Sequence, residues 1–124
     1  MSHKLLLLIS FFLIALMGQA QNDIKHVEPP LWWHDMINNE VELLIHGEKI
    51  RGLKPKISDH RIQLKKVTPG DSENYLFLLL ELSKVTVETD FTITLVGDGR
   101  DISIPYSLKS KRSNSDRSKG INAA

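Results

Sequence analysis

Apolar and polar residues alternate with a period of two along most of this chain, a pattern typical of half-buried β-strands. Turn-forming residues separate the alternating runs, and no helical periodicity or internal repeat competes with them. Strands are predicted over residues 24–28, 41–45, 75–82, 91–95 and 101–108, and one or two more over residues 57–67. About seven short strands with turns between them predict an all-β, immunoglobulin-like β-sandwich.

Turn and edge signals refine this prediction. Thr68–Glu73 is rich in turn residues, and Gly97–Arg100 predicts a tight hairpin because its Asp-Gly pair tolerates positive φ. Pro105 has no N–H to donate to a ladder, so the last strand is predicted to lie at a sheet edge or to carry a bulge.

The strongest predicted strand, residues 75–82, is apolar on both faces, although a sandwich strand needs only one apolar face. One face carries Leu76, Leu78, Leu80 and Leu82, and the other carries Tyr75, Phe77 and Leu79. Either loops of the same domain cover the second face, or its residues belong to an interface with a missing domain or subunit.

The segment Pro29–Met36, P-P-L-W-W-H-D-M, holds both tryptophans of the chain. Adjacent side chains on an extended backbone point in opposite directions, so Trp32 and Trp33 cannot both face one core. Pro29 and Pro30 fix φ and remove two backbone donors, which predicts a rigid loop. Either one tryptophan closes the open end of the sandwich and the other is incidental, or at least one contacts a neighbouring domain, a partner or a ligand.

Both ends of the chain are predicted to lie outside the domain. Residues 1–20 combine a positive start, an apolar run and a small-residue cleavage site, which predicts a signal peptide. The apolar run is shorter than the roughly 20 residues of a membrane span, so we expect an exported protein, periplasmic or secreted, with no membrane contact after cleavage. Residues 21–108 form the predicted domain, and the basic, Ser-rich residues 109–124 form a predicted linker toward a missing domain.

Composition and motifs narrow the possible chemistry. The chain has no cysteine, which excludes disulfides, thiolate metal sites and thiol catalysis. Lysines and arginines crowd residues 109–119 and leave the folded part mildly acidic, so the fold is not expected to present the basic face that nucleic-acid binding requires. His26 and Glu28 share a strand face, but no third metal ligand follows at a recognisable spacing. We find no catalytic constellation and expect no metal and no cofactor.

Three stretches carry a more specific pattern. Ile24–Met36 contains V-E-P-P-L-W-W-H-D-M, Val41–Ile50 reads V-E-L-L-I-H-G-E-K-I, and Asn74–Leu78 reads N-Y-L-F-L. In this order they resemble the N-terminal domain of bacterial cyclomaltodextrinases and neopullulanases, which are α-amylase-type glycoside hydrolases. Asp35 departs from the family pattern, which commonly has a small residue such as glycine there.

The resemblance implies an immunoglobulin-like N-terminal domain, an (α/β)₈ barrel and a C-terminal β-domain in an enzyme that hydrolyses α-1,4 links of cyclodextrins, maltodextrins or pullulan. The catalytic carboxylates of the family lie in the barrel, so no catalytic residue carries over and this chain alone is not expected to be an enzyme. Trp32, Trp33 and Met36 are the loop residues that map onto the family motif.

We therefore expect a non-catalytic module of an exported starch-degrading enzyme, acting in domain docking, dimerisation or the shaping of the substrate cleft. The expected partner is the catalytic barrel of the same enzyme or a partner subunit. The candidate contacts are Trp32, Trp33, His34 and Met36, with Tyr75, Phe77 and Leu79 as a possible interface strand. One alternative is a free maltooligosaccharide-binding sandwich, in which a tryptophan stacks on a glucose ring. The other is a periplasmic scaffold or adhesion domain without sugar binding.

Overall fold

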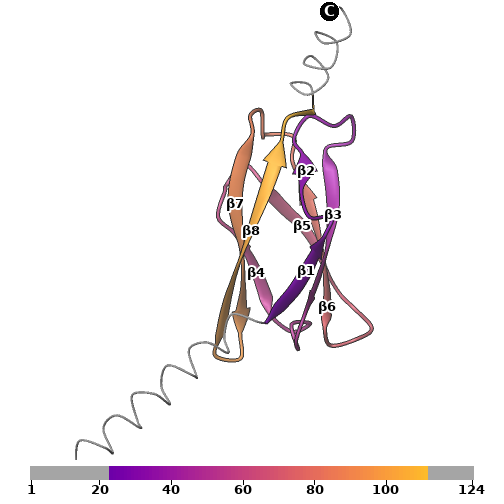
Figure 1. The fold of residues 1–124 in the computed structure, drawn as a ribbon, viewed down its shortest axis with the longest axis vertical. Helices are drawn as coiled ribbons and strands as arrows, with labels where there is room; N and C mark the ends of the chain where they lie inside the picture. Colours follow the sequence, from indigo (N-terminus) through magenta and orange to yellow (C-terminus); the bar gives the residue numbers. More distant parts are fainter. Residues whose placement is uncertain (1–22, 112–124) are drawn as a thin grey trace, which may run out of the picture.

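Two four-stranded β-sheets build the fold, which confirms the predicted all-β sandwich. The computed structural model describes residues 23–111. The strands are β1 (Ile24–Glu28), β2 (Trp32–Trp33), β3 (Glu40–Gly47), β4 (Lys54–Ile57), β5 (Gln63–Pro69), β6 (Tyr75–Glu81), β7 (Thr89–Gly97) and β8 (Arg100–Lys109). The first sheet has the order β1-β3-β6-β5 and the second β2-β8-β7-β4 (Figure 1).

The core lies between the sheets and is built from alternate residues of the strands, as the period-two pattern requires. On β6, Leu76, Leu78 and Leu80 are fully buried, and Leu43 and Ile45 of β3 face the same core. Each fully buried leucine or isoleucine contributes about 1.5–3 kcal/mol relative to an exposed one. The predicted inward face of the two-faced strand is thus confirmed.

The count of eight strands exceeds the expected seven because the tryptophans form a strand of their own. Trp32 pairs with Leu108 and Trp33 with Lys109, and β2 and β8 run parallel. The prediction of a plain loop was wrong at these two residues. Their backbone groups meet the end of β8, whose second edge is otherwise free among the described strands, and hydrogen-bonding groups of the backbone pair where they can.

The hairpin prediction is confirmed, whereas β8 lies between β2 and β7 and is an edge only over the part that carries Pro105. Asp98 and Gly99 have φ of 52° and 70°, the values that the Asp-Gly pair was expected to adopt. Pro105 lies in β8 opposite Thr92 of β7, in the part of β8 that has no second neighbouring strand among the described residues. Its missing N–H therefore costs no ladder hydrogen bond.

The predicted turn Thr68–Glu73 begins too early, because β5 continues to Pro69 and pairs Thr68 with Phe77. β5 is an outer strand of the first sheet, where a proline is tolerated. The turn itself closes at Gly70, whose N–H donates to the carbonyl oxygen of Tyr75 over 3.0 Å.

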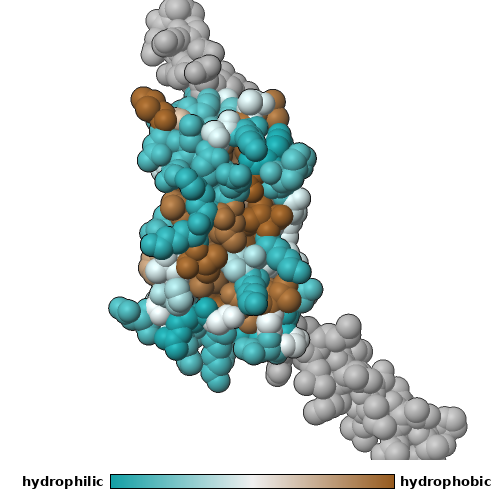
Figure 2. All heavy atoms as spheres, turned by 180° about the vertical axis from the view of Figure 1, so that it is seen from behind, coloured by the Kyte–Doolittle hydropathy of each residue, from teal (hydrophilic) through white to brown (hydrophobic). Residues whose placement is uncertain are grey.

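The described chain enters at one end of the sandwich and leaves at the other. β8 ends beside the loop between β1 and β3 (Figure 1). On the side facing away from β8, apolar side chains gather in the middle, with hydrophilic ones above and below them (Figure 2). Within residues 23–111 no helix has the length and apolar character to cross a membrane. The predicted signal peptide and most of the predicted linker lie outside the described residues.

Candidate functional site

The loop of residues 31–39, which we call the Trp loop, is fixed to the end of β8 by its own backbone. The N–H of His34 donates to the carbonyl oxygen of Lys109 over 3.0 Å, directly after the β2 pairing. At its other end, the carbonyl oxygen of Asn39 accepts the N–H of Leu82 over 2.8 Å. The loop is thus held at both ends by strands that are remote in the sequence.

The rings of the two tryptophans are in contact with each other, and they differ in what else they touch. Trp32 packs against the core, and its Nε1 is buried with no hydrogen-bond partner among the described residues. The Trp33 ring lies with its centroid 5.4 Å from that of Trp32, tilted by 55°. Lys111 Nζ lies 6.0 Å from the Trp33 centroid, near the limit of a cation–π contact. Trp32 therefore closes the sandwich end, and Trp33 belongs to the loop surface.

Asp35, the residue that departs from the family pattern, links the Trp loop to the chain that leaves β8. Its Oδ1 accepts the N–H of Lys111 over 2.8 Å, and its Oδ2 accepts the hydroxyl of Ser110 over 3.3 Å. The N–H of Ser110 donates in turn to Glu88 Oε1 over 3.2 Å. Sequence reasoning missed this link because the partners are far apart in the chain.

Beside this link the surface is hollowed and apolar. An open pocket of about 500 Å³ is lined by Asp35, Met36, Ile37, Asn38 and Lys111. Ile37 is completely exposed, with a relative accessibility of 104%, and Met36 Sδ lies 3.9 Å from Lys111 Nζ. In the sequence, Ile37 follows Met36 and precedes two asparagines, and this apolar residue in a polar loop is the signal that could have identified it.

The second candidate surface lies on the outer side of the first sheet. Tyr75, Phe77 and Leu79 are half-exposed there. The Trp loop does not cover them, because β2 belongs to the opposite sheet and Trp32 packs inward. The loop and the strand are therefore two separate surfaces, and the structure does not bring the two sets of predicted residues together.

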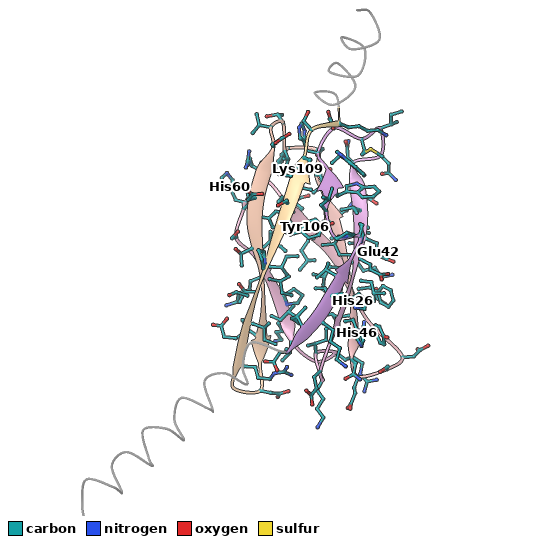
Figure 3. All side chains as sticks on the ribbon, viewed as in Figure 1. His26, Glu42, His46, His60, Tyr106 and Lys109 are labelled. Carbon is teal, nitrogen blue, oxygen red and sulfur yellow. The ribbon has the colours of Figure 1, made fainter. Side chains whose placement is uncertain are left out.

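Two histidines and a tyrosine form a row of rings on this outer side. The rings of His46 and Tyr75 stack with centroids 4.5 Å apart and an angle of 6°, and His26 meets His46 edge-on at 4.9 Å. Burial lowers the pKa of His46, and the nearby His26 and Lys25 lower it further. Figure 3 shows His26 and His46 together on β1 and β3.

His26 and Glu28, which share a strand face, form an exposed pair. His26 Nε2 lies 3.4 Å from Glu28 Oε1, with 45% and 65% of the two side chains accessible. Over residues 23–111 there is no group of three or more histidine, cysteine or acidic side chains that could hold a metal ion.

Comparison with protein families matches residues 26–112 to the N-terminal domain of cyclomaltodextrinase. The chain belongs to this family. The match spans both tryptophans and all eight strands except the start of β1. Cyclomaltodextrinase is a glycoside hydrolase, so membership supports a non-catalytic module of an α-amylase-family enzyme.

In this cyclomaltodextrinase N-terminal domain, hydrogen bonds join two of the stretches that resemble the family, Val41–Ile50 and Asn74–Leu78. The carbonyl oxygen of Asn74 accepts the N–H of Gly47, and its side-chain Oδ1 accepts the N–H of Lys49, each over 2.9 Å. Lys49 has a positive φ of 52°, which the asparagine holds in place. The asparagine that precedes β6 therefore fixes the turn that follows β3.

Proposed function

We propose that this chain is the N-terminal docking module of an exported α-amylase-family hydrolase of starch-derived α-1,4-glucans. In this proposal the Trp loop packs against the catalytic barrel of the same enzyme. The observation that carries this proposal is the fully exposed side chain of Ile37. It lies beside an open pocket at the end of the sandwich where β8 ends.

The loop is suited to docking because it is already ordered. Asp35, His34 and Asn39 are each bonded to another part of the domain, so little conformational entropy remains to be lost on contact. An apolar residue that is fully exposed on a fixed loop gains most from being covered. At the rim, Asn38 Oδ1 already accepts the N–H of Glu40, so the donors for hydrogen bonds at the edge of the contact are the Asn38 NH₂ group and Lys111 Nζ.

The geometry favours docking over a sugar platform. The Trp32 ring is packed against the core, and the Trp33 ring contacts Trp32 and is approached by Lys111 Nζ. Stacking on a glucose ring needs an open aromatic face, and both tryptophans are partly buried.

The test begins with the gene. Reading the frame past the codon for Ala124 should reveal an α-amylase-type barrel, and the enzyme encoded by that frame should hydrolyse cyclodextrins or maltodextrins. In that enzyme, Ile37→Asp should lower the midpoint of thermal unfolding of the barrel and reduce kcat/KM at least several-fold. Gly52→Asp places the same charge in an open turn at the opposite end of the sandwich and serves as the matched control.

Either of two results would overturn the proposal. One is a frame that encodes no barrel. The other is an enzyme in which Ile37→Asp and Gly52→Asp behave alike. A tryptophan fluorescence change on adding maltoheptaose that is lost in Trp33→Ala would replace docking by sugar binding.

A further inference from the structure

The outer face of the first sheet holds two histidines on neighbouring strands. Strand register pairs His26 of β1 with His46 of β3, and residues paired in this way carry their side chains on the same face. The two ring centroids lie 4.9 Å apart, and the rings meet edge-on at 75°. Figure 3 shows the two side chains next to each other, with His60 apart from them. The fold thus supplies a second imidazole that sequence spacing did not place beside His26.

Each ring is oriented by a different neighbour. His26 Nε2 lies 3.4 Å from Glu28 Oε1 on the same strand. A carboxylate beside one ring nitrogen favours the proton on that nitrogen and leaves the lone pair on the other, as in many metal-binding histidines. His46 is held instead by Tyr75, whose ring stacks on it at 4.5 Å and 6°. Both imidazoles are therefore positioned before any ligand arrives.

His46 also carries a nitrogen without a partner. Its Nδ1 is buried and has no hydrogen bond among the described residues. Buried polar atoms are nearly always paired, and an unpaired one calls for an explanation such as a water or an ion. This nitrogen is the second observation that points to a ligand at the pair.

We propose that His26 and His46 together bind one Zn²⁺ ion. Imidazole nitrogen is a preferred ligand of zinc, and two nitrogens on one tetrahedral ion are about 3.4 Å apart when each bond is about 2.1 Å. Rings whose centroids lie 4.9 Å apart can present two nitrogens at this separation. Water completes the coordination, because residues 23–111 contain no group of three or more side chains that could hold the ion.

Such an ion ties β1 to the rest of the domain. β1 is an outer strand paired with β3, and its register shifts between Ile24 and His26. It leads directly into Pro29 and the Trp loop. An ion that binds the native pair and not the unfolded chain stabilises the native state by mass action. The ion therefore fixes the strand from which the Trp loop starts, whether or not a barrel is docked there.

Titration of the whole chain with ZnCl₂ at pH 7 in a calorimeter provides the test. Histidine has an ordinary pKa of about 6.5, so most rings with that pKa are neutral and able to bind the ion at this pH. We expect one ion per chain with a Kd below about 100 µM. With that Kd, 1 mM Zn²⁺ should raise the midpoint of thermal unfolding by about 5 °C or more, and EDTA should reverse the rise.

Histidine variants locate the ion. His26→Asn and His46→Asn should each raise the Kd at least tenfold and remove most of the rise in the midpoint. Glu28→Gln should raise the Kd by less, about three- to tenfold, because it removes the group that orients a ring and keeps both nitrogens. His60→Asn, at an exposed position between β4 and β5, is the matched control and should change neither quantity. Every variant retains His3 and His34, so differences among the variants report on the substituted side chains.

Several results would overturn the proposal. One is a Kd above 1 mM, and another is equal binding by His26→Asn and His60→Asn. A stoichiometry of one ion for two chains would also overturn it, because the ion would then bridge separate molecules. His26 is accessible enough for its variant to fold, which circular dichroism checks, so the test does not depend on His46→Asn. Ile37→Asp should leave the affinity for Zn²⁺ unchanged, so failure of this proposal and failure of docking are distinguishable.

Discussion

The phenolic hydroxyl of Tyr106 donates a hydrogen bond of 2.8 Å to the carbonyl oxygen of Pro29. Tyr106 lies on β8 of the second sheet and is 3% exposed, and its ring meets that of Phe91 edge-on at 5.6 Å. Pro29 directly follows β1 of the first sheet and precedes the Trp loop. One side chain therefore joins the two sheets at the point where the loop begins.

Tyr106→Phe removes this hydrogen bond and leaves the packing unchanged. The loss should lower the free energy of unfolding by about 1–2 kcal/mol, because the carbonyl oxygen of Pro29 loses its partner in a partly buried position. Urea denaturation followed by tryptophan fluorescence measures the change. Tyr75→Phe is the matched control, since Tyr75 is half-exposed and its hydroxyl has no bond in the described structure, and it should shift the free energy by less than about 0.5 kcal/mol. Equal effects of the two variants would contradict this account.

Asp59 should make the stability of the domain depend on pH in strongly acidic solution. Side-chain hydrogen bonds from Arg61, at 2.6 and 3.0 Å, and the N–H of Arg61 at 2.9 Å lower the pKa of Asp59 to about 2. An unfolded aspartate has a pKa of about 3.9, so the unfolded chain binds more protons between these values. The stabilisation is therefore complete above about pH 4 and is lost as the pH falls through about 2.

The measurement is the urea midpoint between pH 2 and pH 6. Asp59→Asn should lower the midpoint at pH 6 and flatten its dependence on pH below 4. Asp101→Asn, at an exposed position, should leave both unchanged. Arg61 also donates to Thr89 Oγ1 over 3.2 Å. The urea midpoint therefore depends also on the contact between the Asp59–Arg61 turn and β7. A slope that persists in Asp59→Asn would assign the acid sensitivity to other carboxylates.

Gly47 should tolerate no side chain. A Cβ there would lie 2.5 Å from the carbonyl oxygen of Asp23 and 2.8 Å from Ile24 Cδ1, so backbone would have to move. Gly47→Ala should cost about 1–3 kcal/mol, as overpacking does. Gly52, five residues on, has open space around it, and Gly52→Ala should be neutral or slightly stabilising. Thermal unfolding of both variants checks the contrast, and a neutral Gly47→Ala would show that β1 can move away from β3.

The tryptophans should differ in what they contribute to stability. Trp32→Ala removes a ring packed against the core and should cost about 3 kcal/mol. Trp33→Ala removes a surface ring and should cost less than about 1 kcal/mol. The free energy of unfolding in urea, followed by circular dichroism, compares the two variants. A larger loss for Trp33→Ala would reverse our assignment of the inward ring.

Local patterns predicted the strands well because alternation records burial directly. Residues 91–95 and 101–108 were predicted from alternation and turns, and β7 and β8 contain them. The family was also predicted, from short motifs, and the match over residues 26–112 confirms it. These features depend on near neighbours in the chain.

What the sequence concealed depends on distant partners. β2 exists because Trp32 and Trp33 meet the end of β8, and no property of a Trp-Trp pair reveals that meeting. Asp35 departs from the family pattern, yet its carboxylate accepts the N–H of Lys111, a residue of the predicted linker. The roles of the Trp loop and of the outer face of β6 as interfaces stay predictions.

The parallel pairing of β2 with β8 has a mechanical consequence. The described chain starts at one end of the sandwich and leaves at the other, so tension between the two ends acts along the strands (Figure 1). Parallel neighbours under such tension slide past each other, and their hydrogen bonds are loaded in shear, all at the same time. The bonds of Trp32 and Trp33 to the end of β8, followed by that of His34, lie on this line of force. Any domain that pulls on this one through the chain after Lys111 therefore loads the bond between Lys111 and Asp35 and then the pairing of the tryptophans with β8.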